Sequence, residues 1–249
     1  MLAIFKREFK SYFTTPIGYI VLAAFYFFLG WFFYTVYSNG VAAVEICIVS
    51  TSTVAVFILP VLTMRLMSDD RRQKVDQVLL TAPVKITSIV LGKLLAAFAV
   101  YAMAFIPTII FEIIFASHLS VNILTYLYAL LGAMLFGGVL ISIGMFISSM
   151  TESPVISAML SLLANVAILF MANFVSLLPQ ASGGTNFFEK AWEKILDFIT
   201  ALLEKAALVS TFEKFSESVF NVTDVVYLLS IIFVFVFLSV RSLEKRRWS

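Results

Sequence analysis

The stretch VNILTYLYALLGAMLFGGVLISIGMFISSM, residues 121–150, decides the fold. It contains no charged residue, and it is longer than the about 20 apolar residues that a helix needs to cross a bilayer. Apolar residues make up 61% of the chain and charged residues only 13%, whereas soluble domains have roughly 45–50% and about 25%. A water-soluble core could not bury this much apolar surface. The sequence therefore predicts an all-α, polytopic membrane protein.

Five further apolar stretches predict, together with residues 121–150, six transmembrane helices. They are residues 17–37, 44–66, 86–117, 154–178 and 223–240. The stretch 86–117 exceeds a hydrocarbon core of ~30 Å at about 1.5 Å per residue, and Pro107 predicts a kink near its outer end. Apolar segments fill most of the chain, so residues 1–249 are interpreted as a single transmembrane domain.

The Lys and Arg residues are distributed unevenly between the two sides of the predicted bundle. If the N-terminus is inside, thirteen of the 17 lie on the cytoplasmic side, and four lie outside: Lys190, Lys194, Lys205 and Lys214. Cytoplasmic loops of membrane proteins are enriched in Lys and Arg. This bias predicts a multi-pass protein of the cell (plasma or inner) membrane with both termini in the cytoplasm.

Three segments outside the predicted spans have amphipathic patterns. Residues 1–15 place Phe at helical spacing between Lys and Arg, which predicts an interfacial helix on the inner surface. Residues 68–81, SDDRRQKVDQVLLT, predict a short cytoplasmic helix with Ser68 as its N-cap and two aspartates in its first turn. The outer segment, residues 179–221, predicts one or two amphipathic helices too polar to span.

Motifs for catalysis and metal binding are missing from the sequence. One histidine and one cysteine cannot supply a zinc site with the usual ligand spacing. The chain has no H-E-x-x-H, no G-x-S-x-G and no phosphate-binding P-loop. We expect no enzyme activity, no cofactor bound by this chain and no nucleic-acid partner. Any ATP and Mg²⁺ would be used by a partner subunit.

Polar residues inside the spans are candidates for a pathway lining, because such residues are costly in lipid. The candidates are Glu45, Thr53, Glu112, Ser157, Ser161 and Asn165. An alternative for the two glutamates is that they reach water at the outer surface. An alternative for Ser157, Ser161 and Asn165, which recur every four residues, is hydrogen bonding to another helix. The sequence leaves these alternatives open.

Residues 67–98, MSDDRRQKVDQVLLTAPVKITSIVLGKLLAAF, resemble the membrane subunit of ABC-2 type ABC transporters. The shared features are the acidic pair Asp69-Asp70, the basic pair Arg71-Arg72, the run Leu79–Val84 and the pair Gly92-Lys93. The sequence departs at Lys74, Val75 and Gln77, where the family usually has Gly, Thr and Glu. The first thirty or so residues and the basic, Trp-containing end are similar to the gliding-motility-type branch of that family.

The resemblance implies a type V exporter-like fold, with residues 68–81 as the coupling helix that contacts an ATPase. The implied coupling residues are Asp69, Asp70, Arg71, Arg72, Lys74, Asp76 and Gln77. It also implies ATP-binding subunits, a second permease copy or a related permease, an accessory membrane protein, and a surrounding lipid bilayer. The implied function is an export pathway formed with the second permease.

Two other functions are compatible with a polytopic helical chain. An energy-independent membrane scaffold or assembly protein would need no ATPase, and residues 68–81 would then be a plain connector. A secondary transporter usually has internal repeats and helices broken at mid-membrane depth. The sequence has no repeat and few titratable groups at that depth, so the permease and the scaffold are the two main hypotheses.

Overall fold

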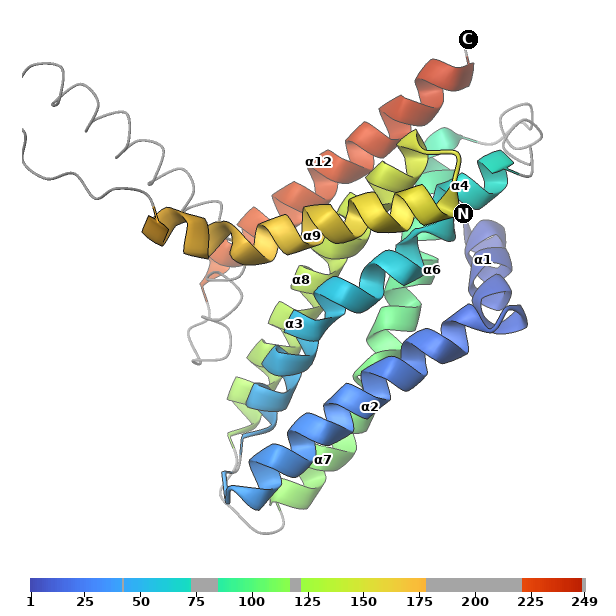
Figure 1. The fold of residues 1–249 in the computed structure, drawn as a ribbon. Helices are drawn as coiled ribbons and strands as arrows, with labels where there is room; N and C mark the ends of the chain where they lie inside the picture. The colour runs from blue at the N-terminus through green and yellow to red at the C-terminus, as the bar shows by residue number, and fades with distance from the viewer. Residues whose placement is uncertain (42, 73–84, 117–121, 178–220, 248–249) are drawn as a thin grey trace, which may run out of the picture.

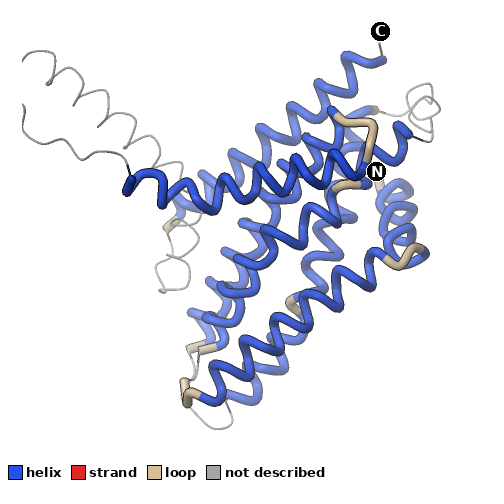
Figure 2. Tube along the Cα trace, in the orientation of Figure 1, coloured by secondary structure: helices blue, strands red, loops and turns tan. Residues whose placement is uncertain are grey.

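The computed structural model describes residues 1–41, 43–72, 85–116, 122–177 and 221–247. These residues form helices joined by short turns, and none of them is in a strand (Figures 1 and 2). The helices are α1 (Leu2–Thr14), α2 (Ile17–Ser38), α3 (Val44–Thr63), α4 (Arg65–Arg72), α6 (Ile86–Ala104), α7 (Ile106–Ala116), α8 (Ile123–Met150), α9 (Pro154–Leu177) and α12 (Val222–Arg247). The all-helical prediction is therefore confirmed for the described residues.

Five helical spans in the described part of the chain are long and apolar enough to cross a membrane. They are Pro16–Ser38, Val44–Arg72, Ile86–Ala116, Ile123–Met150 and Val222–Lys245. Helix α9 contributes a shorter apolar stretch, Pro154–Phe170. The protein is thus a multi-pass membrane protein, and the exact number of six spans remains a prediction.

Helix α8 is the central element of the bundle and packs against α3, α6, α9 and α12. Small residues allow this packing, since a Cβ on Gly137 would lie 2.0 Å from Cε1 of Tyr101 on α6. A Cβ on Gly144 would lie 2.3 Å from Oγ1 of Thr63 on α3. The buried Tyr101 hydroxyl donates to the carbonyl of Ala133 at 3.0 Å. Backbones can approach closely at such positions, and this holds α6 and α3 against α8.

The long predicted span 86–117 is broken near its outer end. Helix α6 ends at Ala104 and α7 begins at Ile106, so the break comes directly before Pro107. Proline has no backbone N–H and its ring disfavours helical geometry in the residues before it. The predicted kink at Pro107 is confirmed.

The predicted start of the cytoplasmic helix at Ser68 is wrong. Helix α4 begins at Arg65, with only Met64 between it and the end of α3, and Ser68 lies within it. The Ser68 hydroxyl donates to the carbonyl of Met64 one turn earlier instead of capping a new helix. Its two aspartates are consequently not in a first turn. The remainder of the predicted helix, residues 73–81, and the predicted outer helices lie outside the described residues.

Helix α1 confirms the amphipathic helix predicted for residues 1–15, and it packs against α6 and α2. Phe5, Phe9 and Phe13 form a row of ring contacts that is partly buried against the core. Part of the apolar face of α1 therefore contacts protein. This contact fixes α1 beside the first turns of α6.

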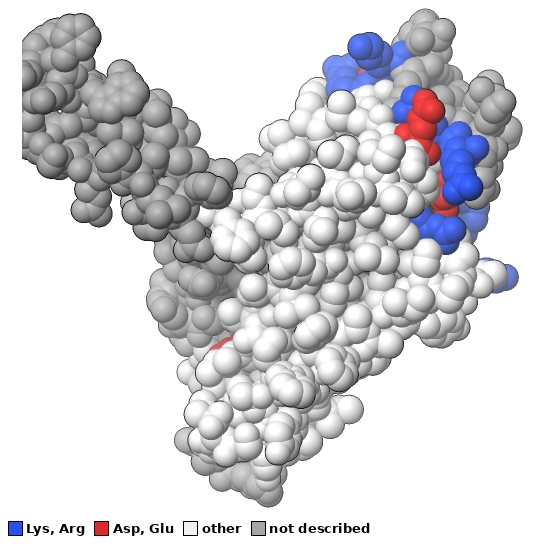
Figure 3. All heavy atoms as spheres, in the orientation of Figure 1, with Lys and Arg blue, Asp and Glu red and all other residues white. Residues whose placement is uncertain are grey.

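Charged side chains gather at one end of the molecule. Figure 3 shows Lys, Arg, Asp and Glu over the end at which Figure 1 places both termini, while most of the rest of that face is uncharged. The C-terminal part of α12 brings Arg241 and Lys245 to this end. Helices α4 and α1 reach this end too, and ion pairs connect them there.

Candidate functional site: an ion cluster joining three helices

Lys93 is a cation buried inside the protein at the charged end. Its side chain is 1% exposed and lies two turns into the helix α6, which is otherwise apolar or uncharged. The ammonium Nζ is 2.7 Å from Oδ2 of Asp70 on α4 and 3.3 Å from Oε1 of Glu8 on α1. It also donates to the carbonyl of Leu66 at 2.6 Å. Three acceptors thus match the three donors of a lysine, which makes the buried charge tolerable.

Arg7 brings a second cation to the same two carboxylates. Its Nη2 lies 2.5 Å from Oε1 of Glu8 and 3.9 Å from Oδ2 of Asp70. Burial alone would lower the pKa of Arg7. Its hydrogen bond to Glu8 and the charges of Glu8 and Asp70 together outweigh burial, so the pKa of Arg7 lies above its usual value. We call Arg7, Glu8, Asp70 and Lys93 the ion cluster; it joins α1, α4 and α6.

A glycine beside Lys93 explains how α1 comes close enough to take part. A Cβ on Gly92 would lie 3.1 Å from Cγ2 of Ile4 and 3.3 Å from the carbonyl oxygen of Met1. A larger residue would require Ile4 and the start of α1 to move by a few tenths of an ångström. The pair Gly92-Lys93 therefore has two roles, since the glycine gives room and the lysine supplies the charge.

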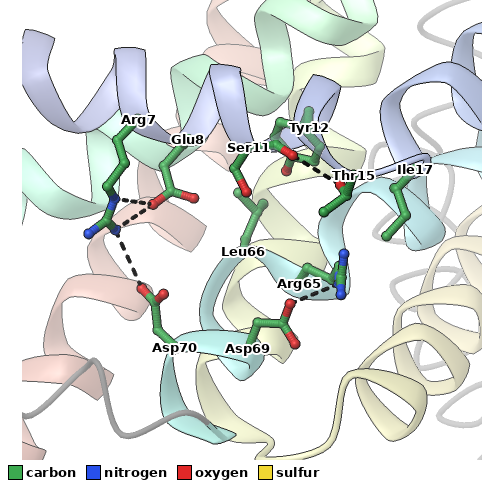
Figure 4. A pocket seen from close by; sticks show the side chains of 10 residues that line it. All are labelled: Arg7, Glu8, Ser11, Tyr12, Thr15, Ile17, Arg65, Leu66, Asp69 and Asp70. Carbon is green, nitrogen blue, oxygen red and sulfur yellow. Dashed lines mark hydrogen bonds and ion pairs between the residues drawn. The ribbon is translucent and has the colours of Figure 1, made fainter.

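A polar cavity of about 260 Å³ lies between α1 and α4 (Figure 4). It is lined by Arg7, Glu8, Ser11, Tyr12, Thr15, Ile17, Arg65, Leu66, Asp69 and Asp70. Figure 4 shows Arg7 reaching toward Asp70 at one end, while Arg65 and Asp69 pair at the other end at 2.8 Å. Side chains across this cavity, rather than backbone packing, connect α1 to α4.

Tyr12 of α1 also lines this cavity and is buried. Its hydroxyl donates to the carbonyl of Leu62 on α3 at 3.1 Å. Burial raises the pKa of Tyr12, the charge of Glu8 raises it further, and Arg65 opposes them weakly. The phenol therefore remains neutral and keeps donating across the whole physiological pH range.

The other side of α4 is bonded to the end of α8 and to the turn that follows it. Arg71 forms an ion pair with Glu152 and donates to the carbonyl of Met150 at 3.1 Å. The hydroxyl of Ser148 accepts from the backbone N–H groups of Met67 and Ser68, each at 3.1 Å. It donates to the carbonyl of Met64, directly before α4. Helix α4 is thus bonded to α6 on one side and to the α8–α9 turn on the other.

The structure places the predicted coupling residues in three different situations. Asp69, Asp70 and Arg71 form ion pairs within this chain. Arg72 is exposed at the end of α4. Lys74, Asp76 and Gln77 lie outside the described residues. Whether any of the seven contacts an ATPase therefore stays a prediction.

Sequence reasoning missed three members of the ion cluster, namely Arg7, Glu8 and Lys93. The sequence pattern identifies Lys93 only as part of the Gly92-Lys93 pair, and it gives Arg7 and Glu8 no role of their own. A signal did exist, because a lysine inside an apolar span is a functional candidate by default and needs an acidic partner. The sequence could not show which carboxylate that partner is.

The candidate lining residues do not form one cluster in the described structure. Glu45 lies in the first turn of α3, and Glu112 lies on α7, 9% exposed, with both carboxylate oxygens unpartnered among the described residues. The hydroxyl of Thr53 donates to the carbonyl of Val49 in its own helix at 3.1 Å. Ser157, Ser161 and Asn165 are buried on α9. Their role as a pathway lining stays a prediction.

The fold and the site define a class, a multi-pass helical membrane protein whose helices are joined by ion pairs at its charged end. The chain belongs to the ABC-2 transporter family: the profile of the family described as ABC-2 family transporter protein matches residues 38–248. No curated protein matches the chain. The family membership identifies a transmembrane transporter component of the permease type, and it accounts for the resemblance at residues 67–98.

Proposed function

We propose that this chain is the membrane-spanning permease subunit of an ABC-2 exporter driven by separate ATP-binding subunits. With a second permease, either a copy or a related chain, it forms the export pathway. Family membership supports the permease role. The observation that carries the link to an ATPase is the bonding of α4 to three other elements, because α4 contains the first residues of the segment that resembles a coupling helix.

The ion pairs suggest how a push on the coupling segment would reach the spans. Asp70 connects α4 to Lys93 on α6 and, more loosely, to Arg7 on α1. Arg71 connects α4 to Glu152 in the α8–α9 turn. A displacement of α4 would consequently move α6, α1 and the start of α9 together. The charged contacts would act as short, rigid links, while the exposed Arg72 and other residues of the coupling segment, 68–81, would contact the ATPase.

The proposal includes a full arrangement in the membrane. The chain has six spans, and both termini and the ion cluster face the cytoplasm, in agreement with the Lys and Arg bias. It belongs to the gliding-motility-type branch, with an accessory membrane protein beside it. ATP and Mg²⁺ bind to the partner subunit, and this chain binds no cofactor and no nucleic acid.

The test is affinity purification of the tagged chain from its native membrane, followed by mass spectrometry and an ATPase assay. We expect an ATP-binding cassette protein in the eluate and ATP turnover. The variant Arg72→Glu should lower recovery of the ATPase about fivefold, which corresponds to roughly 1 kcal/mol. Arg241→Glu is the matched control, because Arg241 is also an exposed arginine at the charged end.

Each outcome of the purification separates the two main hypotheses. An eluate without any ATPase, in a detergent that preserves other membrane complexes, would contradict the permease proposal and support the scaffold. An ATPase whose recovery is equal for Arg72→Glu and Arg241→Glu would support the permease but reject a docking role for the end of α4. A second permease chain in the eluate would establish a heterodimer.

A further inference from the structure

The polar cavity between α1 and α4 has one face of each helix as a wall. On both helices the lining residues come in adjacent pairs that repeat four positions later, and residues so spaced lie on one face of a helix. The ion cluster accounts for the charges at one end of this cavity. Arg65 and Asp69, at the other end, are outside the cluster and have no role in it.

Arg65 has hydrogen-bond donors that the described part of the chain does not use. Its Nε pairs with Oδ2 of Asp69 at 2.8 Å, and its side chain is 36% exposed. A guanidinium has N–H donors on both Nη atoms as well, and among the described residues no ion pair or hydrogen bond occupies them. Figure 4 shows this guanidinium on the side of Thr15 and Ile17, away from Arg7. An oxyanion at this end of the cavity would therefore find a fork of donors.

A second hollow, an apolar groove of about 440 Å³, lies between α2 and α3. It is lined by Ile20, Val21, Ala24, Phe28, Val54, Phe57, Ile58 and Val61. These stretches of seven to eight residues make the groove roughly 10–12 Å long, at 1.5 Å per residue. None of the lining side chains can form a hydrogen bond, so the groove suits a hydrocarbon chain.

The polar cavity and the apolar groove lie in line along the same helical stretches. Ile17, which lines the cavity, is one turn before Val21, which lines the groove. Arg65 of the cavity is one turn after Val61 of the groove, and Met64 between α3 and α4 has α-helical backbone angles. Residues one turn apart share a helix face, so the cavity continues the groove toward the charged end.

Tyr19 indicates the depth of the two hollows in the bilayer. It lies in the first turn of α2, is 60% exposed and contacts the ring of Phe13 on α1. Exposed tyrosines are enriched where the membrane meets water, and α1 has the amphipathic pattern of a helix in that interface. The cavity is therefore at the level of the lipid headgroups, and the groove is in the hydrocarbon layer. A phospholipid divides into a polar and an apolar part at the same level.

We propose that the cavity and the groove together bind one phospholipid with an ethanolamine headgroup, from the leaflet at the charged end. Its phosphate contacts Arg65, its ammonium contacts Asp69, and one acyl chain lies in the groove between α2 and α3. At about 30 Å³ for each water-sized group, a cavity of 260 Å³ has room for a phosphoethanolamine group. The lipid is a resident of the surrounding bilayer and not the cargo, so this site goes beyond the proposed function and does not depend on it.

The charges of the cavity favour a headgroup that carries both signs. The lining has two cations, Arg7 and Arg65, and three carboxylates, Glu8, Asp69 and Asp70. A glycerol headgroup would bring the negative phosphate to these carboxylates without any cation. A choline headgroup has a cation but no N–H group to donate. A primary ammonium donates three hydrogen bonds, and a carboxylate accepts them, so ethanolamine is the headgroup that fits both ends.

Native mass spectrometry of the full chain, delipidated in detergent and titrated with single lipids, tests the proposal. The lipids are phosphatidylethanolamine, phosphatidylcholine and phosphatidylglycerol with identical acyl chains. Arg65→Gln removes the phosphate ligand, and Arg241→Gln is its matched control at an exposed arginine outside the cavity. Ala24→Phe fills the groove, and Ala23→Phe is its matched control, because Ala23 is the exposed neighbour that does not line the groove.

We expect one phosphatidylethanolamine per chain, bound about fivefold more tightly than either of the other lipids. Arg65→Gln should weaken this binding about tenfold, because hydrogen bonds from a guanidinium to phosphate are charge-assisted, and Arg241→Gln should not. Ala24→Phe should reduce binding of all three lipids, and Ala23→Phe should not. Equal affinity for the three lipids, or equal effects of a variant and its control, would overturn the site.

A measurement on the unmodified chain keeps the test valid if a variant does not fold. Phosphatidylethanolamine with a photoreactive acyl chain should label the groove stretches Ile20–Phe28 and Val54–Val61 at least fivefold more than the exposed apolar residues Val155 and Phe233. Even labelling of all exposed apolar faces would overturn the site. These measurements need no ATPase, so their failure leaves the permease proposal standing. Release of the lipid when ATP is added to the purified complex would identify it as cargo and overturn its assignment as a resident lipid.

Discussion

Lys93 shows how much of this site depends on a single side chain. Its ammonium has no contact with solvent, so its stability depends entirely on Asp70, Glu8 and the Leu66 carbonyl. Two of these acceptors, Leu66 and Asp70, lie one turn apart on α4, and the third, Glu8, lies on α1. The sequence indicates that such a lysine needs a partner, but only the packing of α1 beside α6 determines which carboxylates are close enough.

Replacement of Lys93 by Met should destabilise the protein strongly. Removing one partner of a buried ion pair leaves the other uncompensated, at a cost of about 3 kcal/mol in the free energy of unfolding. The measurement is thermal unfolding of the detergent-solubilised protein. The double variant Lys93→Met with Asp70→Asn should lose less than the sum of the single losses, with a coupling of about 1–3 kcal/mol.

An exposed pair provides the control for that comparison. Arg241 and Glu244 are 2.8 Å apart, but their side chains are 63% and 37% exposed. Such surface pairs contribute about 0–1 kcal/mol, so Arg241→Gln should barely change the unfolding temperature. Equal losses for Lys93→Met and Arg241→Gln would show that Lys93 is not buried among its acceptors.

Tyr12 should give the protein a pH-dependent loss of stability at the alkaline end. Its pKa is raised in the folded state, so its contribution is present below the unfolded value of about 10 and is lost as the pH rises above it. Tyr12→Phe should be less stable at pH 7 by about 1 kcal/mol, through the lost hydrogen bond to Leu62. The difference between the two proteins should shrink above about pH 10, measured as the gap in unfolding temperature; a constant gap up to pH 11 would contradict it.

At the scale of the element, sequence patterns predicted the long helices well and α4 poorly. The spans have long apolar runs with few charged residues, and Pro107 marks a real break. The start of α4 is misplaced because Ser68 has the residue type of an N-cap, while Arg65 and Met64 give no turn signal. The decisive information was tertiary, since Ser148 bonds to the backbone of α4 and the Arg65–Asp69 pair stabilises its first turn.

Helix α8 should tolerate no side chain at Gly137. Gly137→Ala would place a methyl group against the buried ring of Tyr101, and overpacking of this kind costs about 1–3 kcal/mol. Gly30 on α2 is the matched control, because nothing lies within 4 Å of the Cβ that alanine would add there. Gly30→Ala should be neutral or stabilising by up to about 1 kcal/mol. Equal unfolding temperatures for the two variants would contradict the close contact between α8 and α6.

The bond between α4 and the α8–α9 turn should matter for coupling more than for stability. Glu152 is 71% exposed, so the Arg71–Glu152 pair contributes no more than about 1 kcal/mol. Arg71→Glu should therefore keep the unfolding temperature within a few degrees but lower the ATP turnover of the purified complex. Restoration by the swapped pair, Arg71→Glu with Glu152→Arg, would show that the link itself transmits the motion. Unchanged ATP turnover in Arg71→Glu would reject this link.

At the scale of the whole molecule, the segregation of charge was predictable and the bonding within it was not. The Lys and Arg count placed the charges on one side, and Figure 3 shows them at one end. A count cannot show that Asp69, Asp70 and Arg71 are used within the chain. That outcome depends on three helices, distant in the sequence, meeting at the same end of the bundle.

The same distribution predicts the orientation of the chain. Fluorescent-protein fusions at both termini should be bright in the cytoplasm, since the ends of α1 and α12 lie at the charged end. A fusion inserted at Asn122, between α7 and α8, should be dark if that turn is exported. A bright insertion at Asn122 combined with dark termini would invert the topology.

The contact between Glu8 and Lys93 also has a consequence for how the protein is made. Helix α1 leaves the ribosome before α6, and Lys93 is synthesised only after two spans have been completed. At 5–20 residues per second, synthesis of the chain from Glu8 to Lys93 takes roughly 4–17 s. During this time Glu8 can pair with Arg7 but not with Lys93. Helix α1 can therefore dock against α6 only after the third span has been made, and this docking is a late step in the assembly of the first three spans.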